Sequence, residues 1–102
     1  MNLIKKGTVF VWCDLATNEV MEYFVATKDF DLDSCYRTNR GKIRINNAWG
    51  FRISNNNFYE LGNGWVVDRI ATEDERRFFY NWMESKGHKF NKNTLNIIRN
   101  FG

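Results

Sequence analysis

Proline is absent from this chain of 102 residues, and histidine occurs once, at His88. His88, Cys13 and Cys35 are too few to form a four-ligand zinc site, and no CxxC pair occurs. Nucleophilic catalysis needs a base beside a nucleophile, and the same three residues offer little for it. We therefore expect no metal, no cofactor and no enzymatic activity. A carboxylate-based enzyme using Glu60 and Asp68 stays open, because such pairs leave no sequence motif.

Long hydrophobic runs are also absent. No stretch of about eighteen consecutive apolar residues occurs, so we expect no transmembrane helix. Residues 1–6 contain two lysines with no apolar run after them, so we expect no secretory signal. Two cysteines in such a chain are expected to be reduced thiols. Together these features predict a cytoplasmic protein without a membrane partner.

The composition favours one small α+β domain. Residues 1–102 are long enough for a single globular unit and too short for two. Short β-rich runs alternate with turn-forming residues, and one strongly helical segment follows them. We expect a twisted antiparallel sheet or small open β-barrel of five to seven strands, packed by one amphipathic helix near the C-terminus.

The first part of the chain predicts a hairpin followed by a long loop. Residues 7–13 and 20–26 are β-rich, and turn-forming residues at 14–18 join them. Apolar side chains fall on both faces of residues 7–13, which is typical of a strand that is covered on two sides. Residues 28–40 predict an irregular loop with one short helical turn, capped by Asp33.

Four more strands are predicted before the helix. They are residues 42–46, 49–53, 58–61 and 65–70, with turns at Asn46-Asn47, at residues 54–57 and at residues 62–64. Alternation in the first of these strands directs Ile43 and Ile45 toward the core. The same alternation directs Lys42 and Arg44 toward solvent.

The helix is predicted over residues 73–86. Thr72 and Glu75 have the spacing of a capping box, in which each side chain bonds the backbone amide of the other residue. The apolar residues of the helix share one face, which should cover the sheet. They are Phe78, Phe79, Trp82 and Met83. Residues 88–101 predict a closing hairpin, with a short helix as the alternative.

Charge is segregated along the chain, whose formal net charge is +3. The charged residues within 14–35 are six acids and one lysine, whereas residues 36–58 hold five cations and no acid. The cations are Arg37, Arg40, Lys42, Arg44 and Arg52, and the aromatic residues among them are Tyr36, Trp49, Phe51 and Phe58. Proteins that bind single-stranded nucleic acid combine cations and aromatic rings in this way. A solvated cationic face is the favoured alternative, because the alternation directs several of these rings into the core.

Residues 70–91 contain an acidic helix start after Ala-Thr, an amphipathic helix, a glycine stop and the sequence His-Lys-Phe-Asn. This segment resembles the C-terminal part of small uncharacterised proteins of bacteriophages and mobile elements. His88 stands where that pattern usually has an aromatic residue. The resemblance implies an accessory protein and carries no catalytic residue across.

The leading hypothesis is therefore a non-enzymatic phage or mobile-element accessory protein that binds a host macromolecule, such as a defence or housekeeping protein that it inhibits. The alternative is a single-stranded nucleic-acid-binding protein that uses the surface of residues 36–58. A protein partner is expected in the first case and a nucleic acid in the second, and self-association stays open.

Overall fold

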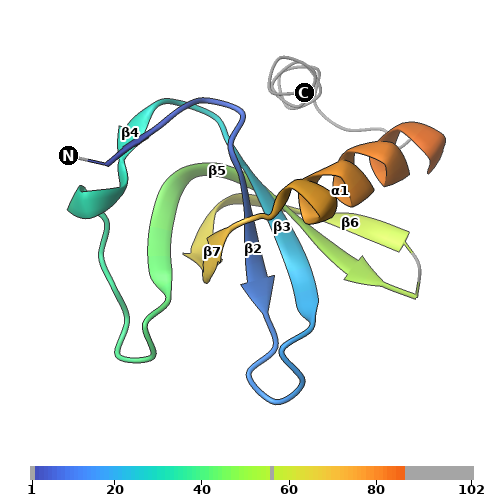
Figure 1. Cartoon of the computed structure of the whole chain (residues 1–102), viewed down its shortest axis with the longest axis horizontal. Helices are drawn as coiled ribbons and strands as arrows, with labels where there is room; N and C mark the ends of the chain where they lie inside the picture. Colours follow the sequence, from blue (N-terminus) through green and yellow to red (C-terminus); the bar gives the residue numbers. More distant parts are fainter. Residues whose placement is uncertain (1, 56, 87–102) are drawn as a thin grey trace.

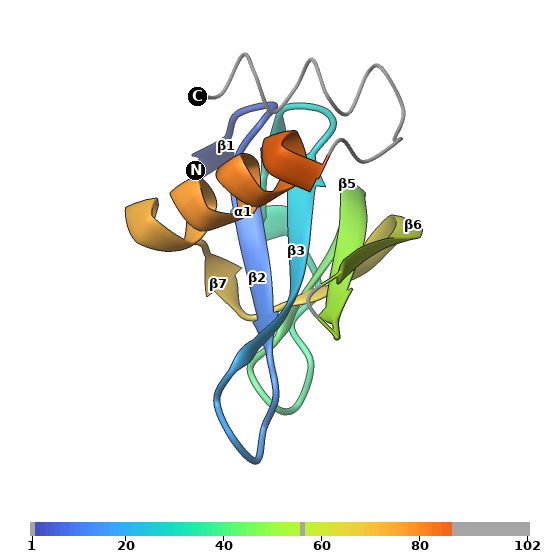
Figure 2. The same cartoon turned by 90° about the vertical axis from the view of Figure 1, so that its right-hand side faces the viewer.

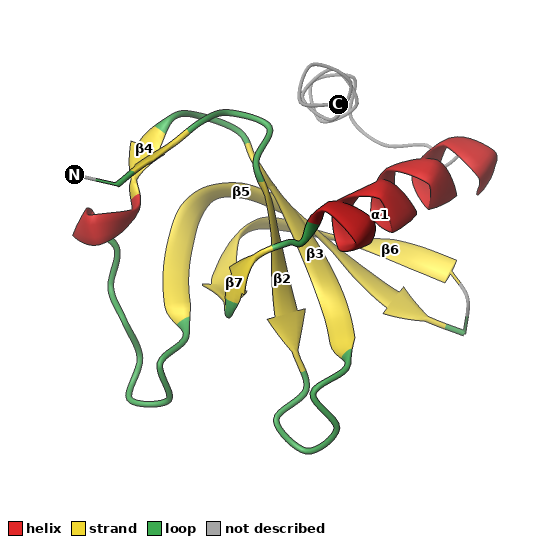
Figure 3. Ribbon diagram, viewed as in Figure 1, coloured by secondary structure: helices red, strands yellow, loops and turns green. Residues whose placement is uncertain are grey.

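The computed structural model describes residues 2–55 and 57–86 of the chain. In chain order the elements are β1 (Leu3–Ile4), β2 (Val9–Cys13), β3 (Val20–Ala26), β4 (Phe30–Asp31), the short 3₁₀ turn η1 (Leu32–Ser34), β5 (Ile43–Ser54), β6 (Asn57–Val67), β7 (Arg69–Ile70) and α1 (Glu73–Lys86). The expected α+β class, a sheet with a helix after it, is confirmed (Figure 3).

One antiparallel sheet contains five strands in the order β6-β5-β3-β2-β7, and β1 pairs separately with β4 (Figure 1). Strands β2, β3, β5 and β6 form a meander. Only Asp68 separates β6 from β7, yet β7 pairs with β2, placing Phe10 opposite Ile70. The chain thus passes from one edge of the sheet to the other, and the sheet curls strongly while remaining open.

Strands β2 and β3 are buried on both faces, as predicted for residues 7–13. Successive side chains point to opposite faces of a strand, so the two strands supply two core clusters. The cluster beneath α1 contains Val9, Val11, Cys13, Tyr23, Val25, Phe51, Phe58, Phe79 and Met83. The cluster on the other face contains Ile4, Phe10, Phe24, Ala26, Leu32, Ile43, Ile45, Ala48 and Val67.

Helix α1 lies across β2 and β3 (Figure 2). Its predicted capping box is confirmed: the Glu75 amide donates to Thr72 Oγ1 at 3.2 Å, and the Thr72 amide donates to Glu75 Oε1 at 2.8 Å. Phe79 and Met83 are buried against the sheet. Phe78, which was predicted on the same covering face, stays 48% exposed because it lies at the edge of that contact.

Two predicted turns are wrong, because both segments lie inside long strands. The first is Asn46-Asn47, which β5 traverses with a register shift between Ile45 and Trp49. The second is residues 62–64, which β6 traverses with Gly62 at a φ of 106°. Bulges absorb an extra residue without ending a strand, and they use the asparagine and glycine residues that also form turns.

The turn predicted at residues 54–57 is confirmed, with Asn55 at a φ of 51°. The short helical turn in residues 28–40 is also present, but Asp33 does not cap it. Asp31 Oδ1 accepts from the Asp33 amide at 3.0 Å, so the cap lies two residues earlier than predicted. The predicted hairpin or helix at residues 88–101 lies outside the described residues.

Candidate functional site

Residues 36–44 fold into a two-stranded arm, which we call the basic ribbon. The Arg44 amide donates to the Tyr36 carbonyl at 2.8 Å, and Arg37 pairs with Ile43. The Thr38 amide donates to the Lys42 carbonyl at 2.8 Å, and the Gly41 amide donates to the Thr38 carbonyl at 3.0 Å. Gly41 has a φ of 80°, a conformation that glycine adopts readily. The ribbon is therefore closed by backbone hydrogen bonds along its length.

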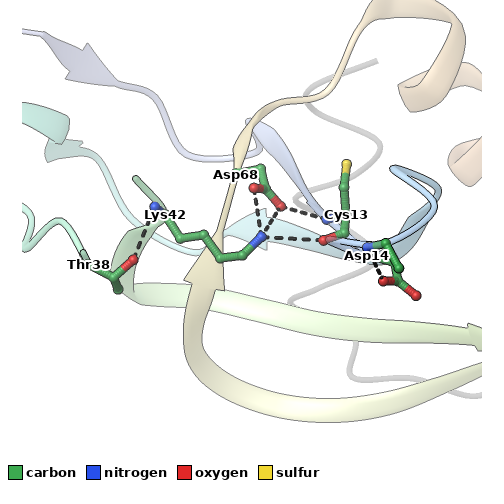
Figure 4. Close-up of polar contacts among 6 residues, drawn as sticks. Cys13, Asp14, Thr38, Lys42 and Asp68 are labelled. Atoms are coloured by element: carbon green, nitrogen blue, oxygen red, sulfur yellow. Dashed lines mark hydrogen bonds and ion pairs between the residues drawn. The ribbon is translucent and has the colours of Figure 1, made fainter. Parts of the chain in front are cut away.

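Lys42 anchors the ribbon to the sheet. It was predicted to face solvent, but it is buried, because its side chain turns inward at the start of β5 (Figure 4). Its Nζ lies 2.7 Å from Oδ1 and 2.8 Å from Oδ2 of Asp68 and donates to the Cys13 carbonyl at 3.3 Å. Its own amide donates to Thr38 Oγ1 at 3.1 Å. Lys42 thus joins the ribbon, the end of β2 and the junction between β6 and β7.

Asp68 completes this junction. Besides holding Lys42, its Oδ2 accepts from the Cys13 amide at 2.6 Å. Lys42 Nζ also lies 5.0 Å from the centroid of the Trp12 ring, within the range of a cation–π contact. A buried ammonium group is costly unless it is paired and hydrogen-bonded, and these contacts provide both.

The remaining side chains of the ribbon are exposed. Tyr36 is 67% exposed, and Arg37, Arg40 and Arg44 all face solvent. None of these three arginines forms an ion pair with another residue in the described part of the chain. The ribbon consequently presents three uncompensated positive charges beside one aromatic ring.

Arg52 does not belong to this group. It lies eight residues beyond Arg44 along β5, and its Nε donates to Glu22 Oε2 at 2.9 Å. Glu22 is only 1% exposed, and its Oε1 has no hydrogen-bond partner among the described residues. The guanidinium of Arg52 thus compensates a buried carboxylate. Of the five predicted surface cations, three remain together on the ribbon, and Lys42 and Arg52 are paired with acids.

The aromatic residues of residues 36–58 also divide into a packed group and an exposed one. Phe51 and Phe58 are buried in the cluster under α1, and Trp49 packs against it. The Nε1 of Trp49 is buried without a hydrogen-bond partner in the described residues. Tyr36 is thus the aromatic ring that the basic ribbon itself presents to solvent.

The pKa values of both cysteine thiols are raised. Burial and the neighbouring Asp68 carboxylate raise the pKa of the Cys13 thiol, which keeps it protonated. Burial likewise raises the pKa of Cys35, and both cysteines are free thiols.

The two carboxylates considered for an enzyme lie in different surroundings: Asp68 forms an ion pair with Lys42, whereas Glu60 is exposed on β6. No three acidic, cysteine or histidine residues gather as metal ligands within the described ranges.

Comparison of the chain with protein-family models, with curated proteins and with solved structures returned no match. In the described ranges, no helix has the length and apolar character needed to cross a membrane.

The inward turn of Lys42 is the main feature that sequence reasoning missed. Lys42 immediately precedes β5, so the strand alternation that was used to orient it does not apply there. Its partner lies 26 residues away, at the point where β6 gives way to β7. The available signal was Asp68, which follows the apolar run of residues 65–67. A single aspartate does not identify the residue with which it pairs.

Proposed function

We propose that this chain is a non-enzymatic binding protein that engages a macromolecular partner, as an accessory protein of a phage or mobile element would engage a host macromolecule. The observation that carries the proposal is the basic ribbon, whose three arginines are exposed and lack ion pairs in the described part of the chain. Charges left uncompensated on a surface attract an oppositely charged partner and accelerate its association.

The anchoring of the ribbon supports a binding role. Ordering a flexible loop at an interface costs free energy that a preformed loop avoids. The backbone bonds within residues 36–44 and the contacts of Lys42 with Asp68 order the ribbon before any partner arrives. The ribbon can therefore bind with little conformational change.

The ion pairs of the fold also support a role without chemistry. Lys42 and Asp68 bond one another, Arg52 bonds Glu22, and Arg69 bonds Glu75. Each of these pairs links two parts of the fold, so its presence is explained without a reaction.

A pull-down from bacterial lysate tests this proposal. The chain, immobilised at low ionic strength, is expected to retain one macromolecule in stoichiometric amount and to release it as salt is raised. Recovery of no stoichiometric macromolecule at low salt would contradict the proposal.

A role in binding single-stranded nucleic acid remains the second candidate, favoured by Tyr36 beside the three arginines of the ribbon. A gel-shift titration with the double variant Arg40→Glu/Arg44→Glu tests it, because both residues are exposed and their reversal leaves the anchor intact. This candidate predicts that the wild-type chain shifts oligothymidylate and the double variant does not. Absence of a wild-type shift would remove it.

A further inference from the structure

A second loop projects from the same end of the sheet as the basic ribbon. It is the turn between β2 and β3, residues 14–19, which we call the hairpin tip. Both loops extend away from α1 in two perpendicular views (Figures 1 and 2). Their bases are joined, because Lys42 Nζ donates to the carbonyl of Cys13, the residue that precedes the tip.

The hairpin tip is ordered by its own hydrogen bonds. The Ala16 amide donates to Asp14 Oδ1 at 2.8 Å, the Asn18 amide donates to the Asp14 carbonyl at 2.8 Å, and the Asp14 amide donates to the Glu19 carbonyl at 2.9 Å. Asn18 adopts a φ of 61°, which asparagine tolerates better than most residues. This turn holds the Leu15 side chain in solvent, where it is 62% exposed.

The two loops together present a mixed surface. The ribbon contributes Tyr36 and the three arginines, and the tip contributes the exposed side chains of Leu15 and Glu19. Tyrosine and arginine are enriched among the residues that dominate protein–protein binding energy. A nucleic-acid strand carries negative charge along its whole length, so a strand that crosses both loops meets the carboxylate of the tip, whereas a protein surface can confine its carboxylates to the part that faces the ribbon.

We infer that the basic ribbon and the hairpin tip form one docking surface for a protein partner whose own surface presents carboxylates to the ribbon and an apolar pocket to the tip. The arginines of the ribbon pair with those carboxylates, and Leu15 and Tyr36 fill the apolar part. This inference rests on the proposed binding function and adds the surface and the chemistry of the partner.

The first experiment measures binding to a defined probe by fluorescence anisotropy. The probe is a labelled peptide with glutamates in one half and phenylalanines in the other, and oligothymidylate is the competitor. We expect Arg40→Glu/Arg44→Glu to weaken peptide binding at least about tenfold. The matched control, Lys6→Glu/Lys28→Glu, makes the same change in net charge at exposed positions outside both loops and should change affinity less than about threefold.

A further variant, Leu15→Ser, separates the apolar contribution from charge. We expect it to weaken peptide binding by about threefold to tenfold without changing the salt dependence. Three results would overturn the inference: equal losses in the two charge-reversal variants, no effect of Leu15→Ser, or oligothymidylate that binds more tightly than the peptide.

The lysate experiment separates failure of this inference from failure of the proposed function. If the wild-type chain and Arg40→Glu/Arg44→Glu retain the same macromolecule equally, the binding function stands and the assigned surface is wrong. If the wild-type chain retains none, the binding function itself is wrong.

Discussion

Lys42 is the residue on which the candidate site depends. Its ammonium group is removed from water, and the carboxylate of Asp68, the Cys13 carbonyl and the Trp12 ring replace the lost hydration. Pairs of this kind often contribute little compared with apolar residues, but removal of one partner leaves the other charge uncompensated. We therefore regard Lys42 as a structural residue that orients the basic ribbon.

Replacement of Lys42 tests this role. Lys42→Met should lower the free energy of unfolding by about 2 to 3 kcal/mol, because Asp68 loses its cation while remaining partly buried. Arg44→Met is the matched control, since Arg44 is exposed and forms no ion pair in the described residues; it should cost less than about 0.5 kcal/mol. Urea denaturation measures both values. Equal costs for the two variants would contradict the anchoring role.

Gly50 is required for space rather than for backbone freedom. A Cβ atom at this position would clash with Cε2 of Phe24 and would lie 2.6 Å from its Cδ2. Phe24 is fully buried and cannot move aside freely.

Gly50→Ala should therefore cost about 2 to 3 kcal/mol of stability through overpacking. In a Phe24→Leu background the smaller side chain makes room, and the added cost of Gly50→Ala should fall below about 1 kcal/mol. Thermal or urea unfolding of the four proteins gives the coupling. An equal cost of Gly50→Ala in both backgrounds would show that the Phe24 ring is not the obstacle.

At the scale of elements, α1 is held at its start by Glu75. This carboxylate accepts from the Thr72 amide and forms a two-pronged ion pair with Arg69 of β7. The hydrogen bond from Arg69 is the main cause that lowers the pKa of Glu75 to about 2 from its ordinary value of 4.5. One side chain thus links the helix start to the strand that pairs with β2.

The lowered pKa makes a pH-dependent contribution to stability. Because the folded chain holds Glu75 ionised more tightly than the unfolded chain does, the contribution is complete above pH 4.5 and is lost as the pH falls toward 2. Glu75→Gln should cost about 1 to 2 kcal/mol near pH 7 and much less near pH 2. Urea denaturation across this range measures the difference. A cost that does not change with pH would contradict the ionic part of the contact.

The docking of α1 depends on one aromatic ring. Phe79 is fully buried, and its ring stacks on Tyr23 with centroids 4.9 Å apart and also meets Phe51 and Phe58. Burial is also the main cause that raises the pKa of Tyr23 to about 12, so Tyr23 stays neutral beneath the helix.

Phe79→Ala should accordingly cost about 3 to 5 kcal/mol, the usual range for removing a buried phenylalanine. Phe78→Ala, one residue earlier and half exposed, should cost about 1 kcal/mol. Comparison of the two unfolding midpoints tests the orientation of the helix. A larger loss for Phe78→Ala would mean that α1 is rotated from the position described.

Local sequence features predicted the helix correctly but gave wrong bounds for the long strands. The helix was predicted within its observed bounds, because the capping box and the apolar arc are local features of residues 72–86. β5 and β6 were each divided in two, because Asn46-Asn47 and Gly62 look like turns. Whether such residues form a turn or a bulge depends on pairing with the neighbouring strand, which is not a local property. Residues 65–70 were predicted as one strand, but Asp68 separates the end of β6 from β7, which pairs with β2.

At the scale of the whole molecule, the curl of the sheet brings distant segments together. The end of β2, the start of β5 and the junction of β6 with β7 meet at Lys42 and Asp68. The sequence was sufficient to nominate Arg37, Arg40 and Arg44 as surface cations. It was insufficient to separate them from Lys42 and Arg52. The ion pair of Lys42 with Asp68 spans 26 positions and that of Arg52 with Glu22 spans 30, so neither is a local feature.

A buried lysine holds residues 36–44 as an ordered arm, and amide hydrogen exchange measured by NMR tests this most directly. The Thr38 and Arg44 amides donate within the ribbon, and the Gly7 amide, which bonds the Ala26 carbonyl, serves as a reference elsewhere in the fold. All three amides should be protected from exchange in the wild-type chain. In Lys42→Met, exchange at Thr38 and Arg44 should accelerate at least about tenfold more than at Gly7. Wild-type Thr38 and Arg44 amides that lack protection, or equal acceleration at all three, would contradict it.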